Sequence, residues 1–248
     1  MSLAGANKSE TQTNEYSDQT SSYLYALDDG RLLGVEFHYE EHQKDSLLVA
    51  LLPDYAEAAR IELPTPGDGD ANLNVLPSFT ADRTRFVYKR GRSVVARQSK
   101  DLGTLWRHAI DASAWGAIRA EYSQNGNWVV VAVRGGPTEH YVEVLNGDSG
   151  KSVMRLSING DNGVGISSDG RHLAVAKQSP VPGGTQVESR VSILEVSSGK
   201  EISSVVLTES AADHAFLEGG FGYHGIRFTP DDRYLIGSGN HTKVWKIG

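Results

Sequence analysis

Short apolar runs separated by turn residues repeat along most of the chain. In residues 224–248, three such runs at 224–228, 233–237 and 242–247 are divided by polar and glycine-rich segments. Pro230 and the two aspartates that follow it mark the first turn, because proline presets φ and an Asp side chain can bond the backbone two residues on. This stretch therefore predicts three antiparallel strands.

The same plan recurs four more times upstream, each time with four runs. The predicted strands lie at 22–27, 32–38, 46–52 and 58–63, then at 76–79, 85–89, 93–98 and 104–110, then at 117–122, 128–134, 141–145 and 152–158, and finally at 163–167, 172–177, 190–196 and 201–207. Residues 55–63 (YAEAARIEL) also have helix-favouring composition. A strand is preferred there because the neighbouring runs repeat as strands.

Two turn markers give the repeats a common phase. The first is an Asx residue after the first strand of each unit, recurring about every 40–60 positions as Asp29, Asp82, Asn125, Asp169 and Asp231. The second is a Gly-Lys pair after the third strand, at 150–151 and 199–200. A sandwich would lack this fixed double-turn phase, so a propeller is preferred, with a sandwich or a barrel as the alternative. The pattern predicts an all-β protein: a β-propeller of about five blades, each a four-stranded antiparallel sheet, with the last blade incomplete at the C-terminus.

The fourth unit, GVGISSDGRHLAVA at residues 163–176, resembles the blades of WD-repeat and YVTN-type propellers. Trp245 stands where that family carries its Trp-Asp pair, with Lys246 in place of the aspartate. The resemblance covers about residues 22–248 and implies one propeller domain. It also implies an interaction platform more often than an enzyme.

Composition narrows the classes of function. The net charge of −7 argues against a nucleic-acid binder, which needs a basic stripe. The chain has no cysteine, which excludes disulfides and thiolate chemistry. No apolar run reaches the roughly 18 residues of a membrane span. Residues 1–21 are polar and are predicted to be a disordered or artificial leader. The alternative is a tether left after removal of an export signal.

Long connections identify a candidate partner-binding face. In a blade, the first and third connections share one face, and here they are tight. The longer connections, at 38–45, 64–74, 135–140, 178–189 and 208–223, lie on the opposite face. Insertions gathered on one face favour binding there, although loops are also simply tolerated at low cost. The predicted partner-binding residues on this face are His38, Tyr39, His42, His140, Tyr141, Phe216, Phe221, Tyr223 and His224. Phe216 and Phe221 are equally well explained as structural residues packed over the blade core, whereas Tyr39 and Tyr141 are expected to be exposed.

Two segments on the same face have residues that could hold a metal ion. Asp68, Asp70 and Asn72 alternate as calcium ligands do, but position twelve of the loop is Phe79 and not a glutamate. Ordinary turn chemistry is the preferred interpretation of this segment. The histidines, together with Glu40, Glu41 and Glu139, would suit zinc or iron, but a solvated loop is preferred. No cofactor is therefore predicted.

No nucleophile elbow, P-loop or dinucleotide motif occurs in the sequence. The preferred hypothesis is a non-catalytic propeller that binds a protein, a peptide or another macromolecule. The alternative is a hydrolase of the glycosidase or lactonase type, with an acid pair or a metal in the central channel. A third hypothesis is a structural module that associates through its incomplete fifth blade.

Overall fold

The computed structural model describes residues 20–38, 46–51, 56–62, 77–90, 92–110, 117–134, 140–158, 163–180, 186–210, 226–238 and 242–247. All regular structure in these residues is β-strand. The strands are β1 Thr20–Ala26, β2 Leu32–His38, β3 Ser46–Leu51, β4 Ala56–Glu62, β5 Ser78–Phe79, β6 Arg85–Arg90, β7 Ser93–Gln98, β8 Thr104–Ala109, β9 Ala117–Tyr122, β10 Trp128–Arg134, β11 His140–Asn146, β12 Ser152–Ile158, β13 Val164–Ile166, β14 His172–Pro180, β15 Gln186–Glu195, β16 Glu201–Ser210, β17 Ile226–Phe228, β18 Tyr234–Ser238 and β19 Thr242–Lys246.

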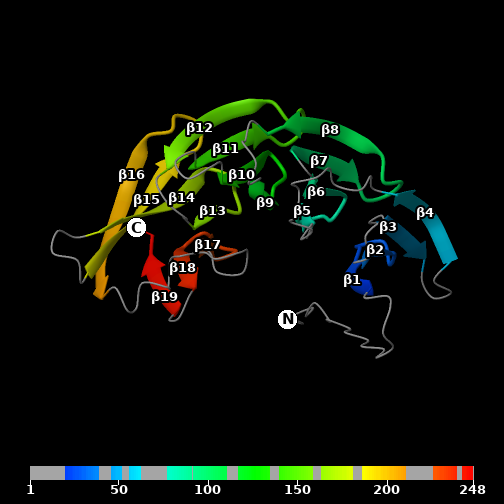
Figure 1. Ribbon diagram of the computed structural model, residues 1–248, viewed down its shortest axis with the longest axis horizontal. Coiled ribbons are helices and arrows are strands. Elements are labelled where there is room, and N and C mark those ends of the chain that lie inside the picture. Colours follow the sequence, from blue (N-terminus) through cyan, green and yellow to red (C-terminus); the bar gives the residue numbers. More distant parts are fainter. Residues whose placement is uncertain are drawn as a thin grey trace.

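The strands form five separate antiparallel sheets, which are the blades of a propeller. Four sheets have four strands each (β1–β4, β5–β8, β9–β12 and β13–β16), and the fifth contains β17, β18 and β19. The sheets follow one another around an arc, with β1, β5, β9, β13 and β17 on its inner side (Figure 1). The predicted fold class is confirmed, including the three-stranded sheet of residues 224–248. The segment that also favoured a helical turn is the strand β4.

Turns between the first and second strands, here called inner turns, share one hydrogen-bond pattern. In four blades a hydroxyl group at the start of the turn donates to the Asx side chain two residues later, over 2.6–2.7 Å; the pairs are Thr80–Asp82, Ser123–Asn125, Ser167–Asp169 and Thr229–Asp231. The first blade has Leu27 at the hydroxyl position. The predicted Asx markers are therefore turn residues that hold their own backbone in place.

A bulge recurs at the start of the outermost strand of every four-stranded blade. The pairing of each third strand with its fourth strand skips one residue, at Ala58, Leu105, Val153 and Ile202. A bulge increases the local twist and bends the strand. The repeated position shows that the four blades share backbone geometry as well as strand order.

The hydrophobic core lies between neighbouring blades. One cluster joins the first and second blades around Leu33 and Phe86, and the next joins the second and third around Val94 and Val131. Two further clusters follow along the arc, and the last includes Ile226 and Leu235 of the fifth blade. Burying one such side chain stabilises the fold by about 1.5–3 kcal/mol. Each blade is therefore stabilised mainly through its neighbours.

One predicted loop is wrong. The connection expected at 178–189 is largely strand, because β14 runs to Pro180 and β15 begins at Gln186. Ser179 pairs with Glu188 and Pro180 with Val187, which extends the hairpin. Polar residues and proline suggested a loop, but backbone pairing with the adjacent strand overrides this local composition. The adjoining strand β16 likewise continues to Ser210, beyond the predicted end at residue 207.

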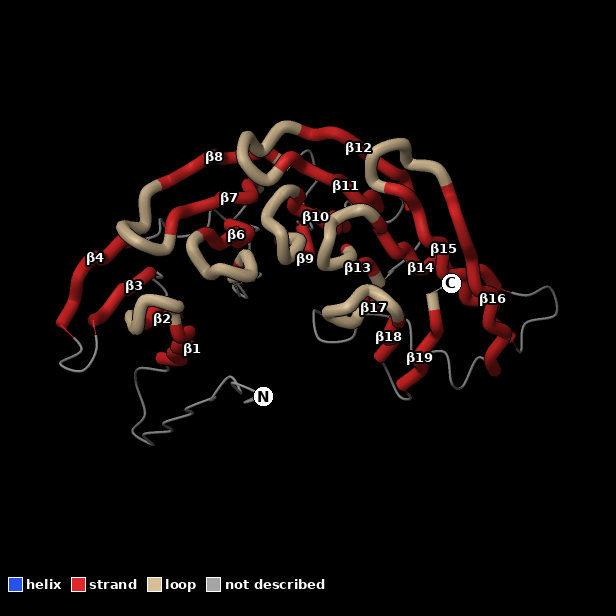
Figure 2. Tube along the Cα trace, turned by 180° about the vertical axis from the view of Figure 1, so that it is seen from behind, coloured by secondary structure: helices blue, strands red, loops and turns tan. Residues whose placement is uncertain are grey.

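The arc is open in the views from both sides, and the sheets β1–β4 and β17–β19 lie at its two ends (Figures 1 and 2). The tan turns of all five sheets lie on one face, here called the tight-turn face (Figure 2). No helix among the described residues is long and apolar enough to cross a membrane. The predicted leader at 1–21 lies outside the described residues, except for the start of β1.

Candidate functional site

The predicted partner-binding residues are only partly described. His38 ends β2 and His140 begins β11. Tyr141 was expected to be exposed, and this is wrong: it is only 4% exposed and belongs to the core between the second and third blades. Its place in the strand alternation turns it towards the second blade, and the Arg155 guanidinium lies 3.7 Å from its ring centroid. The predicted residues outside the described part of the chain are Tyr39, His42, Phe216, Phe221, Tyr223, His224 and the calcium candidates Asp68, Asp70 and Asn72.

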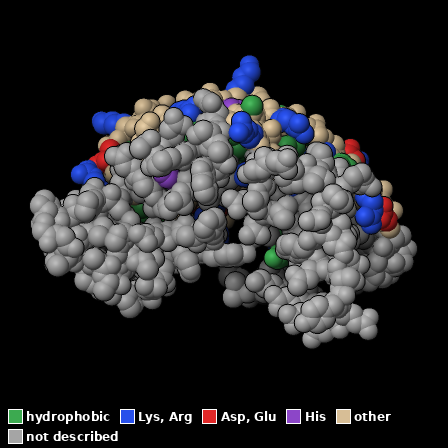
Figure 3. Space-filling view, viewed as in Figure 1, with side chains coloured by type: hydrophobic (Ala, Val, Ile, Leu, Met, Phe, Trp, Pro, Cys, Tyr) green, Lys and Arg blue, Asp and Glu red, His purple; other side chains and the backbone are tan. Residues whose placement is uncertain are grey.

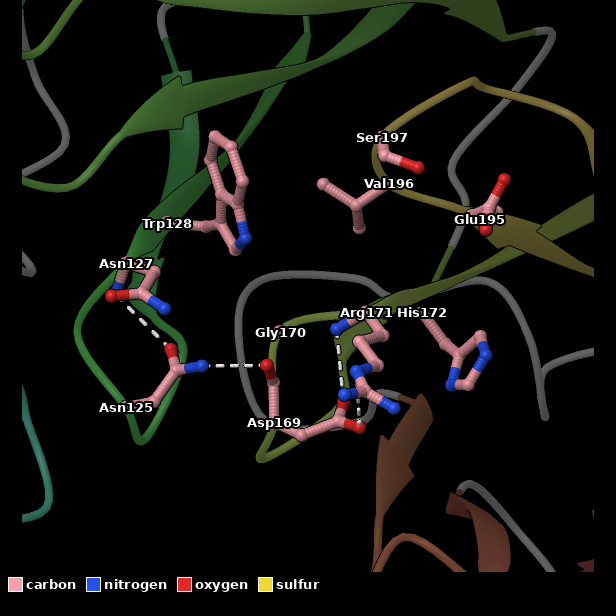
Figure 4. A pocket seen from close by; sticks show the side chains of 10 residues that line it. All are labelled: Asn125, Asn127, Trp128, Asp169, Gly170, Arg171, His172, Glu195, Val196 and Ser197. Carbon is pink, nitrogen blue, oxygen red and sulfur yellow. Dashed lines mark hydrogen bonds and ion pairs between the residues drawn. The ribbon is translucent and has the colours of Figure 1, made fainter.

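A groove of about 720 Å³ opens on the tight-turn face between the third and fourth blades. Its walls are the inner turn of the third blade, the inner turn of the fourth blade and the turn that follows β15. The lining residues are Asn125, Asn127, Trp128, Asp169, Gly170, Arg171, His172, Glu195, Val196 and Ser197 (Figure 4). Trp128 and Val196 supply apolar surface, and polar or charged groups supply the remainder. A mixed lining of this kind suits a peptide more than a wholly apolar ligand.

The two inner turns are tied directly to each other. Asn125 donates from its backbone N–H to the Ser168 carbonyl, over 3.2 Å, and from its side-chain amide to the Asp169 carbonyl, over 2.5 Å. From the fifth blade, the Asp232 carboxylate accepts the backbone N–H groups of Ser168 and Asp169, over 2.6 and 3.0 Å. These two walls of the groove are therefore held by contacts from three blades. A site held this way loses little conformational entropy on binding.

Glycine is required where the fourth blade meets Trp128. Gly170 has φ of +71°, and a Cβ atom there would lie 2.6 Å from Cδ1 of Trp128. The missing side chain lets the turn pack against the edge of the indole. Among the described residues, Nε1 of Trp128 has no hydrogen-bond partner. In contrast, Nε1 of Trp106 donates to the Gly147 carbonyl over 2.8 Å. The Trp128 indole thus offers a free donor at the groove.

Three charged side chains, those of Asp169, Arg171 and Glu195, line the groove. Burial alone would raise the pKa of Asp169, but the Arg171 N–H and the Ser167 hydroxyl donate to its carboxylate and hold the pKa below its usual value. Asp169 therefore remains ionised, and its carboxylate accepts hydrogen bonds from its own turn. The Arg171 side chain is 80% exposed and its guanidinium lies 3.7 Å from that carboxylate. Glu195 is also exposed and accepts the Ser198 hydroxyl over 2.6 Å. Arg171 and Glu195 are the two charges available to a ligand.

The inner strands carry the groups relevant to the hydrolase alternative. On β9, Glu121 is paired with Arg119 at 2.6 Å. Burial lowers the pKa of Arg119, and the nearby charge of Arg227 on β17 lowers it further. No group of three or more potential metal ligands occurs within the described residues. The hydrolase hypothesis stays an alternative prediction.

Sequence reasoning missed the groove because no motif marks it. The Asp-Gly-Arg turn at 169–171 was recognised as turn chemistry, and Trp128 as the start of a strand. Their juxtaposition depends on the packing of one blade against the next. The only signal in the sequence is a tryptophan directly after one inner turn, followed one repeat later by glycine in the equivalent turn.

Comparisons with known proteins identify the fold. The chain matches no family model and no curated protein sequence. It is similar to KlAtg21, solved in a complex with the coiled-coil of AgAtg16, with a TM-score of 0.62 and 11% identity over 96% of this chain and 70% of that one. It is also similar to a eukaryotic initiation factor (TM-score 0.58, 12% identity) and to TolB from Acinetobacter baumannii (TM-score 0.52, 17% identity). These two matches cover 90% and 92% of this chain, and this chain spans 52% of the length of each of those chains. These likenesses, together with the five sheets, show that the fold is a β-propeller.

Proposed function

We propose that this protein is a non-catalytic binding platform that recognises a protein partner, with the Trp128 groove on the tight-turn face as its anchoring site. The observation that carries the proposal is the pre-formed groove. An indole with a free donor and two exposed charges line the same groove, whose inner turns are hydrogen-bonded across three blades. Tryptophan and arginine are the residues most often responsible for binding energy at protein interfaces.

The fold supports a platform of this kind. Propellers present several rigid turns on one surface, and the similar structure KlAtg21 was solved with a coiled-coil bound. The groove suits an extended segment that places an apolar side chain against Trp128. Such a segment would pair a carboxylate with Arg171 and a basic group with Glu195. The face opposite the tight-turn face, here called the long-loop face, carries the longer connections and remains a second predicted contact surface, where His140 is partly buried at the start of β11.

A peptide selection against the whole protein tests the proposal. Peptides selected from a random library on the wild-type chain would be titrated by calorimetry against wild type, Arg171→Glu and Arg233→Glu. Arg233 is a matched control, because it occupies the equivalent turn position in the fifth blade and its side chain is 73% exposed. Arg171→Glu is expected to weaken binding at least about tenfold, since each tenfold step corresponds to about 1.4 kcal/mol. Arg233→Glu should change affinity by less than about twofold.

Each outcome has a defined meaning. Selected peptides that ignore Arg171→Glu but respond to His140→Glu would leave the binding platform standing and move its site to the long-loop face. A selection that yields no specific binder would contradict the platform itself. Equal losses in both arginine variants would indicate a general charge effect and would remove the groove from the proposal.

A further inference from the structure

The outermost strand of the fourth blade differs from its counterparts. β16 has 10 residues, whereas β4, β8 and β12 have 7, 6 and 7. It pairs with β15 on one side, and no described strand pairs with its other edge. The strand lies on the outer rim of the arc (Figure 1). An uncovered edge of this length presents a row of backbone N–H and C=O groups that can pair with another strand.

Charge protects the other outer strands but not this one. An exposed arginine lies within each of β4, β8 and β12, at Arg60, Arg107 and Arg155. In β16, no charged residue occurs between Glu201 and Glu209. Charged side chains on an edge strand oppose pairing with another sheet because pairing would desolvate them. β16 lacks this protection along its centre.

The bulge limits which part of β16 can pair regularly. Its extra residue is Ile202, so the ladder with β15 is unbroken from Ser203 to Ser210. Val206 lies near the middle of this regular stretch and is 49% exposed. The stretch SSVVLTES contains β-branched residues and no proline, which favours strand pairing.

We infer that β16 pairs in antiparallel register with β16 of a second copy of this chain, with Val206 at the two-fold axis. In this register Val206 lies opposite Val206, Val205 opposite position 207, and Ser203 opposite position 209. Apolar positions then meet apolar ones at the centre, and no glutamate faces a glutamate. A register shifted by one pair, with 201 opposite 209, would place two glutamates together. The sequence of the strand is thus complementary to itself in one register.

The two fourth blades would form one continuous sheet of eight strands across the dimer. A single strand pair buries less than the roughly 1,200 Å² of a standard interface. The dimer is therefore weak and depends on concentration. The groove at Trp128 is formed by other strands and turns, so this inference does not depend on the proposed function.

Sedimentation of the whole chain tests the pairing. Wild type is compared with Val206→Lys and with Val153→Lys, from about 1 µM to about 1 mM. Val153 is 51% exposed on the outer strand β12, so it matches Val206 in exposure and in the charge introduced. Wild type and Val153→Lys are expected to dimerise with the same dissociation constant. Val206→Lys, which places two ammonium groups together at the axis, should raise it at least about tenfold. A wild-type chain that stays monomeric throughout would overturn the inference, as would equal effects of the two lysines.

A cysteine placed on the axis tests the register. The chain contains no cysteine, so Val206→Cys introduces a single thiol. Directly opposed residues of an antiparallel pair have Cα atoms about 4.5–5.5 Å apart, within the range that a disulfide spans. Mild oxidation should cross-link Val206→Cys into a dimer at least about ten times faster than Val153→Cys. Equal rates would refute the register. If the wild type is monomeric and β16 instead pairs with added extended peptides, the second copy is the wrong occupant.

Discussion

Replacing Gly170 by alanine should destabilise the protein more than the same change at Gly30, although both glycines occupy the same position of an inner turn. Their φ angles are similar, +71° and +82°. A Cβ atom at Gly30 would have no neighbour within 4 Å, whereas one at Gly170 would lie 2.6 Å from Cδ1 of Trp128. The comparison separates the energy of the left-handed backbone from that of a steric clash.

The magnitudes follow from the two contributions. A non-glycine residue in the left-handed region costs about 1–2 kcal/mol. The chain tolerates this conformation at Arg83 and Asp232, which occupy the same turn position in the second and fifth blades with φ of 50° and 55°. Gly30→Ala is therefore expected to lower the free energy of unfolding by about 1 kcal/mol. Gly170→Ala should lower the free energy of unfolding by about 1–3 kcal/mol more than this, because the packed indole has to move.

Equilibrium unfolding in urea measures the difference. The midpoints of wild type and the two variants give the change in free energy if the m values agree and if circular dichroism and tryptophan fluorescence report coincident transitions. Gly199→Ala should fall between them, since its Cβ would meet the flexible Met154 Sδ at 3.2 Å. Equal losses at Gly30 and Gly170 would refute the packing of the turn against Trp128.

Three further predictions concern single side chains. Trp106→Phe should lose about 1–3 kcal/mol, since it deletes the buried donor to the Gly147 carbonyl; Trp128→Phe should lose less in the same urea experiment, and equal losses would contradict the assigned hydrogen bonding. The Thr229 hydroxyl and Arg233 lower the pKa of Asp231 from 3.8 to about 2, so its stabilisation is complete above pH 3.8 and is lost as the pH falls towards 2. Melting curves of Asp231→Asn should therefore converge with wild type in that window. Burial raises the pKa of Tyr122 from 10.0 to about 12, so its stabilisation is lost as the pH rises through that interval. Tyr122→Phe should lose less stability there than wild type, and spectrophotometric titration should show one fewer late-ionising phenol.

The repeat of strands and turns was predictable from the chain alone. A strand alternates its side chains with period two, and an Asx turn uses only residues within a few positions of each other. Both signals are local, so β2, β7, β9, β10 and β12 have the predicted bounds. The prediction failed where pairing between strands decides the outcome. At Pro180, hydrogen bonding along the hairpin extends a strand through residues whose composition indicates a loop.

The candidate site was decided only by the tertiary structure. Tyr141 carries an aromatic side chain next to a predicted loop, yet both faces of β11 are buried, and only the packing of the second blade against the third covers the face with Tyr141. Trp128 and Arg171 belong to different blades and line the same groove because consecutive sheets pack face to face around the arc. The sequence by itself determined the blades, since their signals lie within each repeat. Only the packing between blades determined which side chains share a surface, because those contacts join residues about one repeat apart.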